Sequence, residues 1–275
     1  MTWLESQRNT DSITIMKIEK IIDETPTVRT LVFSDEFLSK ALPGQFAMVW
    51  IPGVNELPMS IMISQEKGKA AFTVRKHGLS STALYSMKPG DQVGVRGPYG
   101  NSFTIRQGRL LLVGGGTGLV PLMRLVTFLK KTDDVTIMMG AKTKEEVFFE
   151  GLANQLLDQN KHHVIVVTED GTYGKLGLVT DTMQAYLKEN AFDAVYTCGP
   201  EKMMYKVIQL ASKNKIYAEA SIERMMKCGI GLCGSCCFDD VLACKDGTVF
   251  NSQYLLTNKE FGYTHRNKSG ILENY

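Results

Sequence analysis

Five of the six cysteines in this chain fall within residues 225–244, and their spacing predicts an iron–sulfur site. Cys228, Cys233 and Cys236 follow the pattern C-x4-C-x2-C, and Cys244 supplies a further sulfur later in the chain. This is the plant-type spacing for a [2Fe-2S] cluster, whose two irons need four thiolates. We therefore expect these four cysteines to be the metal ligands.

Glycines between the cysteines favour the same interpretation. Gly229, Gly231 and Gly234 lack a β-carbon, so the backbone can turn tightly and direct its amide hydrogens at the cluster sulfurs. Zinc is an alternative, although zinc ribbons usually repeat the C-x2-C pair and this segment has only one. Disulfides or unligated thiols are a further alternative. Cys237 adjoins Cys236 and could replace it as the third ligand.

A second chemically suggestive segment, residues 114–118, reads Gly-Gly-Gly-Thr-Gly. It follows an apolar run at residues 110–113 and precedes a predicted helix over residues 119–130, with Pro121 in the first turn, where proline is tolerated. A strand, a glycine loop and a helix in this order can hold a pyrophosphate on backbone amides at the helix N-terminus. The third glycine of the usual fingerprint is replaced by Leu119.

The middle of the chain alternates strands and helices, which predicts a doubly wound parallel sheet. Further strands are expected at residues 135–139, 164–168 and 194–197, and helices at residues 144–158, 178–188 and 201–213. Ligands bind such sheets beyond the carboxyl ends of the strands. The loops expected there are 114–118, 140–143 and 198–200, which together predict a nucleotide site.

The first third of the chain has short β-branched and apolar runs between glycine, proline and charged turns, which predicts a closed antiparallel β-barrel. Six strands are expected, at residues 13–22, 28–33, 45–51, 59–63, 70–74 and 92–96. A helix over residues 82–87 is expected to interrupt them, with Ser80 and Ser81 capping its first turn. Such a helix start can hold a phosphate.

Composition excludes several classes of function. The chain of 275 residues is 44% hydrophobic and 22% charged, which is ordinary for a folded protein and allows two domains with a small appendage. A net charge of +2 without a long basic run gives no support for binding nucleic acid or an anionic membrane. The first ten residues lack an apolar signal core, so we expect a cytoplasmic protein, where clustered cysteines serve metals or redox chemistry more often than disulfides.

Together these features resemble the ferredoxin-NADP reductase superfamily, and more narrowly the family of electron-transfer subunits of class B dihydroorotate dehydrogenases. The narrow resemblance depends on residues 111–122, on Cys198-Gly199-Pro200 and the residues around it, and on residues 223–250. It implies an FAD-binding barrel over residues 1–106, an NAD-binding domain over 107–222, and a [2Fe-2S] module with a tail over 223–275. It also implies a separate catalytic subunit that carries FMN, in a hetero-oligomer expected to be a heterotetramer of pyrimidine biosynthesis.

The resemblance also assigns roles to residues of this chain. Leu57, Pro58, Met59 and Ser60 are expected at the flavin ring and ribityl chain. Three residues are expected at the flavin pyrophosphate: Gly78, Ser81 and Thr82. Six are expected at the nicotinamide nucleotide: Gly115, Thr117, Gly118, Cys198, Gly199 and Pro200.

The chain departs from many relatives at two of these positions. Leu57 and Met59 stand where arginine and tyrosine are common, so one flavin phosphate loses a cation, which Arg75 or Lys76 could supply. The resemblance requires no general acid or base. NAD or NADP, the direction of flow and the role of residues 251–275 stay open.

Two other functions fit the same residues. One is the electron-transfer subunit of a hydrogenase, a sulfur reductase or a ferredoxin-NADP transhydrogenase. The other is a metal-stabilised interaction module without a redox role.

Overall fold

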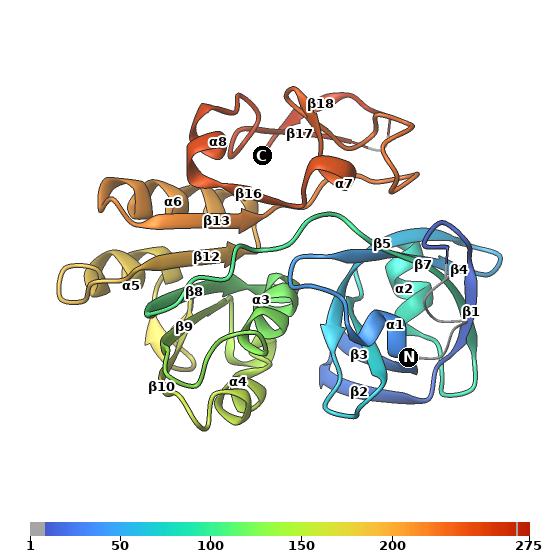
Figure 1. Ribbon diagram of the computed structural model, residues 1–275, viewed down its shortest axis with the longest axis horizontal. Coiled ribbons are helices and arrows are strands. Elements are labelled where there is room, and N and C mark those ends of the chain that lie inside the picture. Colours follow the sequence, from blue (N-terminus) through green and yellow to red (C-terminus); the bar gives the residue numbers. More distant parts are fainter. Residues whose placement is uncertain (1–8, 268) are drawn as a thin grey trace.

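The computed structural model describes residues 9–267 and 269–275 and contains two seven-stranded sheets with a smaller C-terminal part beside them (Figure 1). Residues 1–8 lie outside the described part. Two sequence predictions fall partly on them: the lack of an apolar signal core and the start of the first domain. In the described part of the chain, no helix is long and apolar enough to cross a membrane.

The first sheet is a curled antiparallel barrel, as the sequence predicts. Its strand order is β1-β7-β4-β5-β6-β3-β2. The strands are β1 (Thr14–Lys17), β2 (Lys20–Thr25), β3 (Val28–Ser34), β4 (Phe46–Ile51), β5 (Asn55–Ile63), β6 (Lys69–Arg75) and β7 (Gln92–Tyr99). The edge strands β1 and β2 are consecutive in the chain, and Ile18 between them is fully buried and bonded to the carbonyl of Asp91. One chain turn therefore joins the two edges of the barrel.

Two details of the barrel differ from the sequence prediction. The strand expected over residues 13–22 is two strands, because the chain turns inward at Ile18. The helix is α2 (Leu79–Tyr85), which begins after the N-cap Gly78, so Ser80 and Ser81 lie inside its first turn and not before it. Ser81 nevertheless caps this turn, because its hydroxyl accepts from the amide of Gly78, whereas Ser80 is not the N-cap. A short helix, α1 (Glu36–Ser39), also precedes β4.

The second sheet has the strand order β11-β10-β9-β8-β12-β13-β16. All its neighbours pair in parallel except β13 and β16. The strands are β8 (Arg109–Gly115), β9 (Asp134–Ala141), β10 (Lys161–Thr168), β11 (Lys175–Leu176), β12 (Ala194–Cys198), β13 (Tyr217–Ser221) and β16 (Val249–Asn251). The doubly wound sheet predicted from the alternating pattern is confirmed.

The helices that cover this sheet lie in the four expected regions. They are α3 (Leu119–Val126), α4 (Glu150–Leu156), α5 (Val179–Tyr186) and α6 (Glu201–Lys213). The single helix expected over residues 144–158 is broken into a 3-10 turn (Lys144–Glu146) and α4, because Phe149 takes a left-handed conformation with φ 69°. The strands β13 and β16 were not predicted.

The C-terminal part consists of short elements above the edge of the second sheet (Figure 1). They are β14 (Cys237–Phe238), β15 (Val241–Leu242), α7 (Ala243–Asp246), α8 (Ser252–Thr257), β17 (Thr264–Arg266) and β18 (Leu272–Asn274). Residues 251–267 cover the sheet edge and helix α6: the Tyr263 hydroxyl lies 2.6 Å from that of Tyr205 on α6, and Phe261 is fully buried. The covering role that the sequence left open is therefore observed for this tail.

Strand β4 lies between two hydrophobic cores, which places the cysteine-rich segment against the barrel. Ala47 and Val49 face the barrel interior, whereas Phe46 and Met48 contribute to the core that also contains Cys236 and Cys244. This split follows from the alternation of side chains along a strand. It fixes the position of the cysteine loop relative to the barrel.

Arg124 on α3 joins the second sheet to the barrel. Its buried guanidinium donates to four backbone carbonyls of the barrel part, Ala41 at 2.7 Å, Ile61 at 2.8 Å, Met62 at 3.0 Å and Ser39 at 3.3 Å. A guanidinium is suited to this task because it carries five donors in a fixed plane. The helix that follows the glycine loop is thus held against β5.

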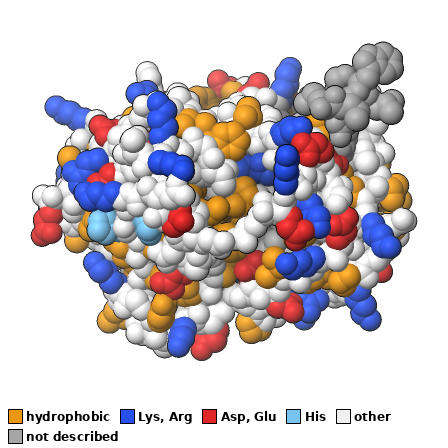
Figure 2. Space-filling view, turned by 60° about the horizontal axis from the view of Figure 1, so that its bottom comes forward, with side chains coloured by type: hydrophobic (Ala, Val, Ile, Leu, Met, Phe, Trp, Pro, Cys, Tyr) orange, Lys and Arg blue, Asp and Glu red, His pale blue; other side chains and the backbone are white. Residues whose placement is uncertain are grey.

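The charges on the surface are mixed. Figure 2 shows Lys and Arg side chains interspersed with Asp and Glu over one face, which is hollowed near its middle where hydrophobic side chains are visible. A nucleic-acid-binding face would gather cations along one stripe. On the face shown, side chains of both signs are mixed.

Candidate functional site

Three of the four predicted cluster ligands lie in one loop, and the fourth, Cys244, lies on helix α7 beside it. The Cys228 sulfur accepts hydrogen bonds from the amides of Leu232 at 3.3 Å and Cys233 at 3.4 Å, and the Cys244 sulfur accepts from the amide of Gly231 at 3.2 Å. The turns that make this possible lie at Gly229, Gly231 and Gly234, with φ of 73°, 80° and 69°. Such values favour glycine, so the sequence prediction of a glycine-shaped cysteine loop is confirmed.

The thiols lie in two interacting pairs, Cys228 with Cys233 and Cys236 with Cys244. No three His, Cys, Asp or Glu side chains converge as ligands of one ion within residues 9–267 and 269–275. Two pairs of thiolates fit a cluster of two irons, because each iron takes two of the four protein ligands. The residues present therefore suit a [2Fe-2S] group.

The two pairs differ in their surroundings. Burial raises the pKa of the Cys233 thiol, but hydrogen bonds with Ser235 and Cys228 outweigh this and lower it to about 6. Burial and the neighbouring Cys236 raise the pKa of Cys244 to about 12. Cys233 is exposed, and Leu232 beside it is 80% exposed, whereas Cys236 and Cys244 are buried. One end of the site therefore faces solvent and the other faces the core.

The cysteine loop rests on the outer face of the barrel. A β-carbon at Gly229 would lie 2.8 Å from Met48 and 3.7 Å from the guanidinium of Arg96. Met48 is paired with Pro58 on strand β5, one of the predicted flavin contacts. The loop thus lies one strand away from residues 57–60.

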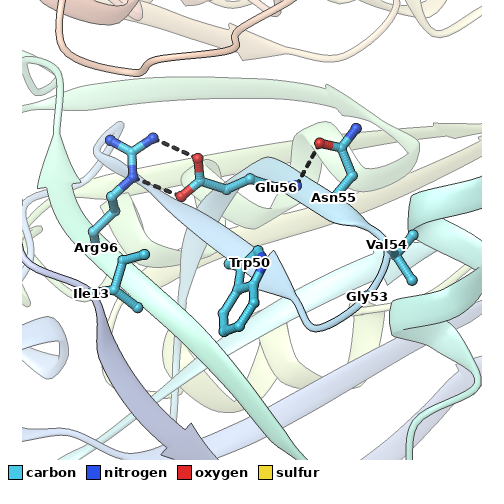
Figure 3. Close-up of a pocket in the computed structure, with 7 residues that line it drawn as sticks. All are labelled: Ile13, Trp50, Gly53, Val54, Asn55, Glu56 and Arg96. Atoms are coloured by element: carbon cyan, nitrogen blue, oxygen red, sulfur yellow. Dashed lines mark hydrogen bonds and ion pairs between the residues drawn. The ribbon is translucent and has the colours of Figure 1, made fainter.

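A shallow pocket of about 440 Å³ adjoins this part of the barrel (Figure 3). Arg96 donates to both carboxylate oxygens of Glu56 at 2.6 Å, and Trp50 and Ile13 form the apolar side. The ion pair fixes the start of β5 directly before Leu57. The ion pair therefore positions this strand.

The predicted flavin residues lie together on β5 and α2, which pack against each other. Leu57 and Met59 pack on the barrel core, whereas Pro58 and Ser60 belong to the other face of the strand. At the start of α2 the Ser81 hydroxyl accepts from the amide of Gly78 at 2.9 Å, and the space beside Gly78 is open. Thr82 lies in the same first turn.

A cleft of about 750 Å³ opens at the carboxyl ends of the parallel strands. It is where the strand and loop pattern predicts a nucleotide, and its walls include six predicted site residues: Arg75, Gly115, Thr117, Gly118, Gly199 and Pro200. Gly116 in this loop has φ of 55°, and Gly199 has φ of 148°. Both turns depend on glycine, which leaves backbone amides accessible to a ligand.

Cys198 and Arg75 occupy contrasting places around this cleft. Cys198 is buried beneath the glycine loop and is not among the residues that line the cleft, and burial strongly raises the pKa of its thiol. A β-carbon at Gly118 would collide with the Cys198 backbone. Arg75, at the end of a barrel strand, reaches the glycine loop and forms an ion pair with Glu146 at 3.3 Å.

Sequence reasoning gave no role to three residues that line the cleft, Glu201, Glu223 and Tyr275, or to Arg224, which binds Glu201. Glu201 is the first residue of α6, and Arg224 binds its two carboxylate oxygens at 2.9 Å each. Glu223 also lines the cleft, where its side chain is exposed. Glu201 directly follows Cys198-Gly-Pro, and Glu223 and Arg224 shortly precede Cys228, which was the signal available for these three; Tyr275 in the tail gave none.

Comparison with known proteins agrees with this geometry. Residues 112–209 match the model of the oxidoreductase NAD-binding domain, and residues 223–256 match the iron-sulfur cluster binding domain of dihydroorotate dehydrogenase B. A protein of Methanocaldococcus jannaschii described as "probable dihydroorotate dehydrogenase B (NAD(+)), electron transfer subunit" is 42% identical, covering 93% of this chain and 96% of the relative. A Thermoplasma volcanium protein with the same description is 40% identical over the same shares.

The chain belongs to the family of dihydroorotate dehydrogenase B electron transfer subunits. Its function class is accordingly that of an oxidoreductase subunit, and membership of this family implies a catalytic partner subunit. The resemblance inferred from the cysteine and glycine motifs is confirmed.

Solved structures place this family within the fold of ferredoxin-NADP reductases. The NADH-dependent reduced ferredoxin-NADP oxidoreductase, studied for flavin-based electron bifurcation, has a TM-score of 0.78 at 27% identity and covers 88% of this chain and 90% of its own. Ferredoxin-NADP+ reductase of Plasmodium falciparum has a TM-score of 0.61 at 19% identity, covering 76% of this chain and 95% of its own. These likenesses and the family models support the three cofactors expected from the sequence, FAD, an iron–sulfur cluster and NAD(H).

Proposed function

We propose that this subunit relays electrons between NAD(H) and a catalytic dehydrogenase subunit that carries FMN, in a heterotetramer that oxidises dihydroorotate. The observation that carries this proposal is the two pairs of thiols, Cys228 with Cys233 and Cys236 with Cys244, set against barrel strand β4. A bound flavin accepts a hydride as two electrons and releases them singly, which lets a cluster pass them on one at a time.

The residues of the chain divide this work. We assign the cluster to Cys228, Cys233, Cys236 and Cys244, and the amides of residues 231–233 stabilise its sulfurs. The first turn of α2 with Gly78, Ser81 and Thr82 would hold the flavin pyrophosphate, and Leu57, Pro58, Met59 and Ser60 would support the flavin. The cleft at Gly115, Thr117, Gly118, Gly199 and Pro200, with Cys198 beneath it, would bind the nicotinamide nucleotide.

The same proposal assigns each cofactor its own part of the chain. We place the flavin on residues 1–106, the dinucleotide on 107–222 and the cluster on 223–275. Strand β16 crosses this last division because it extends the nucleotide sheet from within the third part. The cytoplasm is the expected location, since an exposed cluster ligand such as Cys233 suits a reducing compartment.

A second candidate is the ferredoxin-NADP transhydrogenase class. It is favoured by the fold likeness to the NADH-dependent reduced ferredoxin-NADP oxidoreductase, at 27% identity. The relatives described as dihydroorotate dehydrogenase B subunits reach 42% and extend over most of the chain, so the first candidate is preferred.

Anaerobic purification followed by titration with NADH tests the proposal. We expect visible absorption from flavin and cluster, and bleaching of both by NADH. Cys233→Ser should remove the cluster absorption and leave the flavin, because one of the four thiolates is lost.

Cys237→Ser is the matched control, because Cys237 lies outside the two thiol pairs. We expect it to keep the full spectrum. A protein that lacks flavin and iron–sulfur absorption would contradict the proposal and favour a metal-stabilised interaction module. Copurification with a hydrogenase or ferredoxin-dependent subunit instead of an FMN dehydrogenase would favour the second candidate.

A further inference from the structure

A buried ion pair connects the nucleotide cleft with the cysteine loop. Arg224 and Glu201 have side chains only 1% and 3% exposed, and the guanidinium binds the carboxylate through two bonds of 2.9 Å. The Arg224 guanidinium also lies 4.3 Å from the centre of the Phe238 ring, on hairpin strand β14. Arg224 is four residues before Cys228, and Glu201 directly follows Pro200.

The tail completes this contact. The amide of Gly262 donates to Glu201 at 3.1 Å, and Arg224 donates to the Tyr275 hydroxyl at 3.3 Å. Tyr275 and Glu201 both line the cleft. Nucleotide loop, cysteine segment and tail therefore meet at one carboxylate.

The charge of Glu201 is unusual for its place. A dinucleotide carries a negative pyrophosphate, and the loop with Gly199 and Pro200 belongs to the wall that would receive it. An unpaired carboxylate at the first residue of α6 would repel that ligand, and the second carboxylate, Glu223, projects into the same cleft. Lys202 and Lys206 line the cleft too, but the bidentate partner of Glu201 is Arg224.

We propose that Arg224 is a positioning residue for the dinucleotide: it neutralises Glu201 beneath the nucleotide loop and holds that loop against the cysteine segment. This inference rests on the proposed function, because it takes the cleft as the dinucleotide site. It goes further by assigning the affinity of the cleft to a residue that touches neither ligand nor cluster. The bidentate geometry suits arginine, which matches a carboxylate with two parallel donors.

The test compares Arg224→Met with the double variant Arg224→Met/Glu201→Gln, both as anaerobic holoprotein. Flavin bleaching is followed by stopped flow against NADH concentration, which gives the Kd and the limiting rate. We expect Arg224→Met to raise the Kd about tenfold, corresponding to one like-charge contact. The double variant should return to within about threefold of the unaltered protein, because the uncompensated carboxylate is gone.

Salt and a conservative variant sharpen this result. The Kd difference for Arg224→Met should shrink at high ionic strength, because salt screens the repulsion at the open cleft. Arg224→Lys keeps the charge and should change the Kd less than Arg224→Met. If Arg224→Met does not yield holoprotein, Arg224→Lys takes its place in the test. It is then compared with the double variant Arg224→Met/Glu201→Gln, which lacks both charges. Arg266→Met, which removes a more exposed tail pair with Glu260, is the control and should leave the Kd unchanged.

The outcomes separate this inference from the function on which it rests. If NADH does not reduce the unaltered holoprotein, the proposed function fails. If NADH does reduce the unaltered holoprotein, two results overturn the positioning role alone. One is an unchanged Kd for NADH in the single Arg224 variant, and the other is a raised Kd that the double variant does not restore.

Discussion

The nucleotide sheet is joined to its two neighbours by two buried arginines that have chemically different partners. On the barrel side, Arg124 binds four neutral carbonyls, and in the described part of the chain no carboxylate pairs with it. On the side of the cysteine segment, Arg224 binds the carboxylate of Glu201 at the cleft. The same side chain thus makes a neutral junction in one place and an ion pair in the other.

The two arginines differ in partner because their surroundings differ. The Arg124 junction is closed, and burial lowers the pKa of its guanidinium to about 10 because neutral dipoles replace water only in part. The Arg224 junction borders the cleft, where a charged ligand enters. We infer that the first junction mainly stabilises the fold, whereas the second mainly sets ligand affinity.

The largest expected effect follows from breaking the neutral junction. Arg124→Met should lower the free energy of unfolding by about 3–5 kcal/mol, because it leaves several buried carbonyls without a donor. Denaturation of the holoprotein with guanidinium chloride measures it. Flavin and cluster absorption at saturating cofactor should stay the same.

Arg109→Met provides the matched control for this change. Arg109 is 45% exposed at its side chain and pairs with Asp134 at 3.7 Å, so its loss should cost less than about 1 kcal/mol. Equal destabilisation by the two substitutions would contradict the idea that Arg124 is a special junction.

A smaller effect is expected at Tyr196, whose hydrogen-bond partners are also neutral backbone groups. Its hydroxyl donates to the carbonyl of Thr104 at 2.6 Å and accepts from the amide of Arg106 at 3.0 Å, which ties the linker to strand β12. Tyr196→Phe should cost about 1–2 kcal/mol at pH 8, since the buried tyrosine loses two hydrogen bonds to the backbone of residues 104–106.

The pH dependence of this variant has a defined sign. Burial raises the pKa of Tyr196 from 10.0 to about 12, so the unfolded chain releases this proton first. Stability from this group is present below pH 10 and falls as pH rises toward 12, by up to about 2–3 kcal/mol. Chemical denaturation at pH 8 to 12 should show the gap between the two proteins closing. A gap that widens would contradict this assignment.

The sequence predicted the parts of the molecule that depend on local patterns. The glycine loop at 114–118 and the cysteine loop at 228–236 each combine spacing and backbone freedom within a few residues. Alternating strands and helices sufficed for the parallel sheet. Helix α6 was predicted with its observed bounds, Glu201–Lys213, because a proline precedes it and its apolar face is regular.

The two junctions could not be predicted, because they depend on contacts between distant segments. Arg124 follows Met123 in an apolar helix, and only the approach of Ile61 and Ala41 shows that it is buried rather than solvated. Arg224 contacts Glu201, 23 residues earlier in the chain, across a segment that includes strand β13. Strand β16 was missed for the same reason: three residues give no periodic signal until they pair with β13.

The smallest effect on stability is expected at the third contact between barrel and nucleotide sheet, Arg75 with Glu146. Their side chains are 30% and 34% exposed and 3.3 Å apart, so Arg75→Met should change the free energy of unfolding by less than about 1 kcal/mol. Yet Arg75 lines the cleft and reaches the glycine loop, so its cation is available to a phosphate group.

We therefore expect Arg75→Met to weaken binding of FAD or NADH several-fold, as loss of one charge-assisted contact would. Glu146→Gln, which frees the guanidinium, is the control and should not weaken it. Isothermal titration of NADH and the flavin content after dialysis separate the two ligands. If Arg75→Met lowered the free energy of unfolding as much as Arg124→Met but bound FAD and NADH normally, Arg75 would be a stabilising contact like Arg124. The distinction between stabilising and ligand-facing contacts would then be wrong.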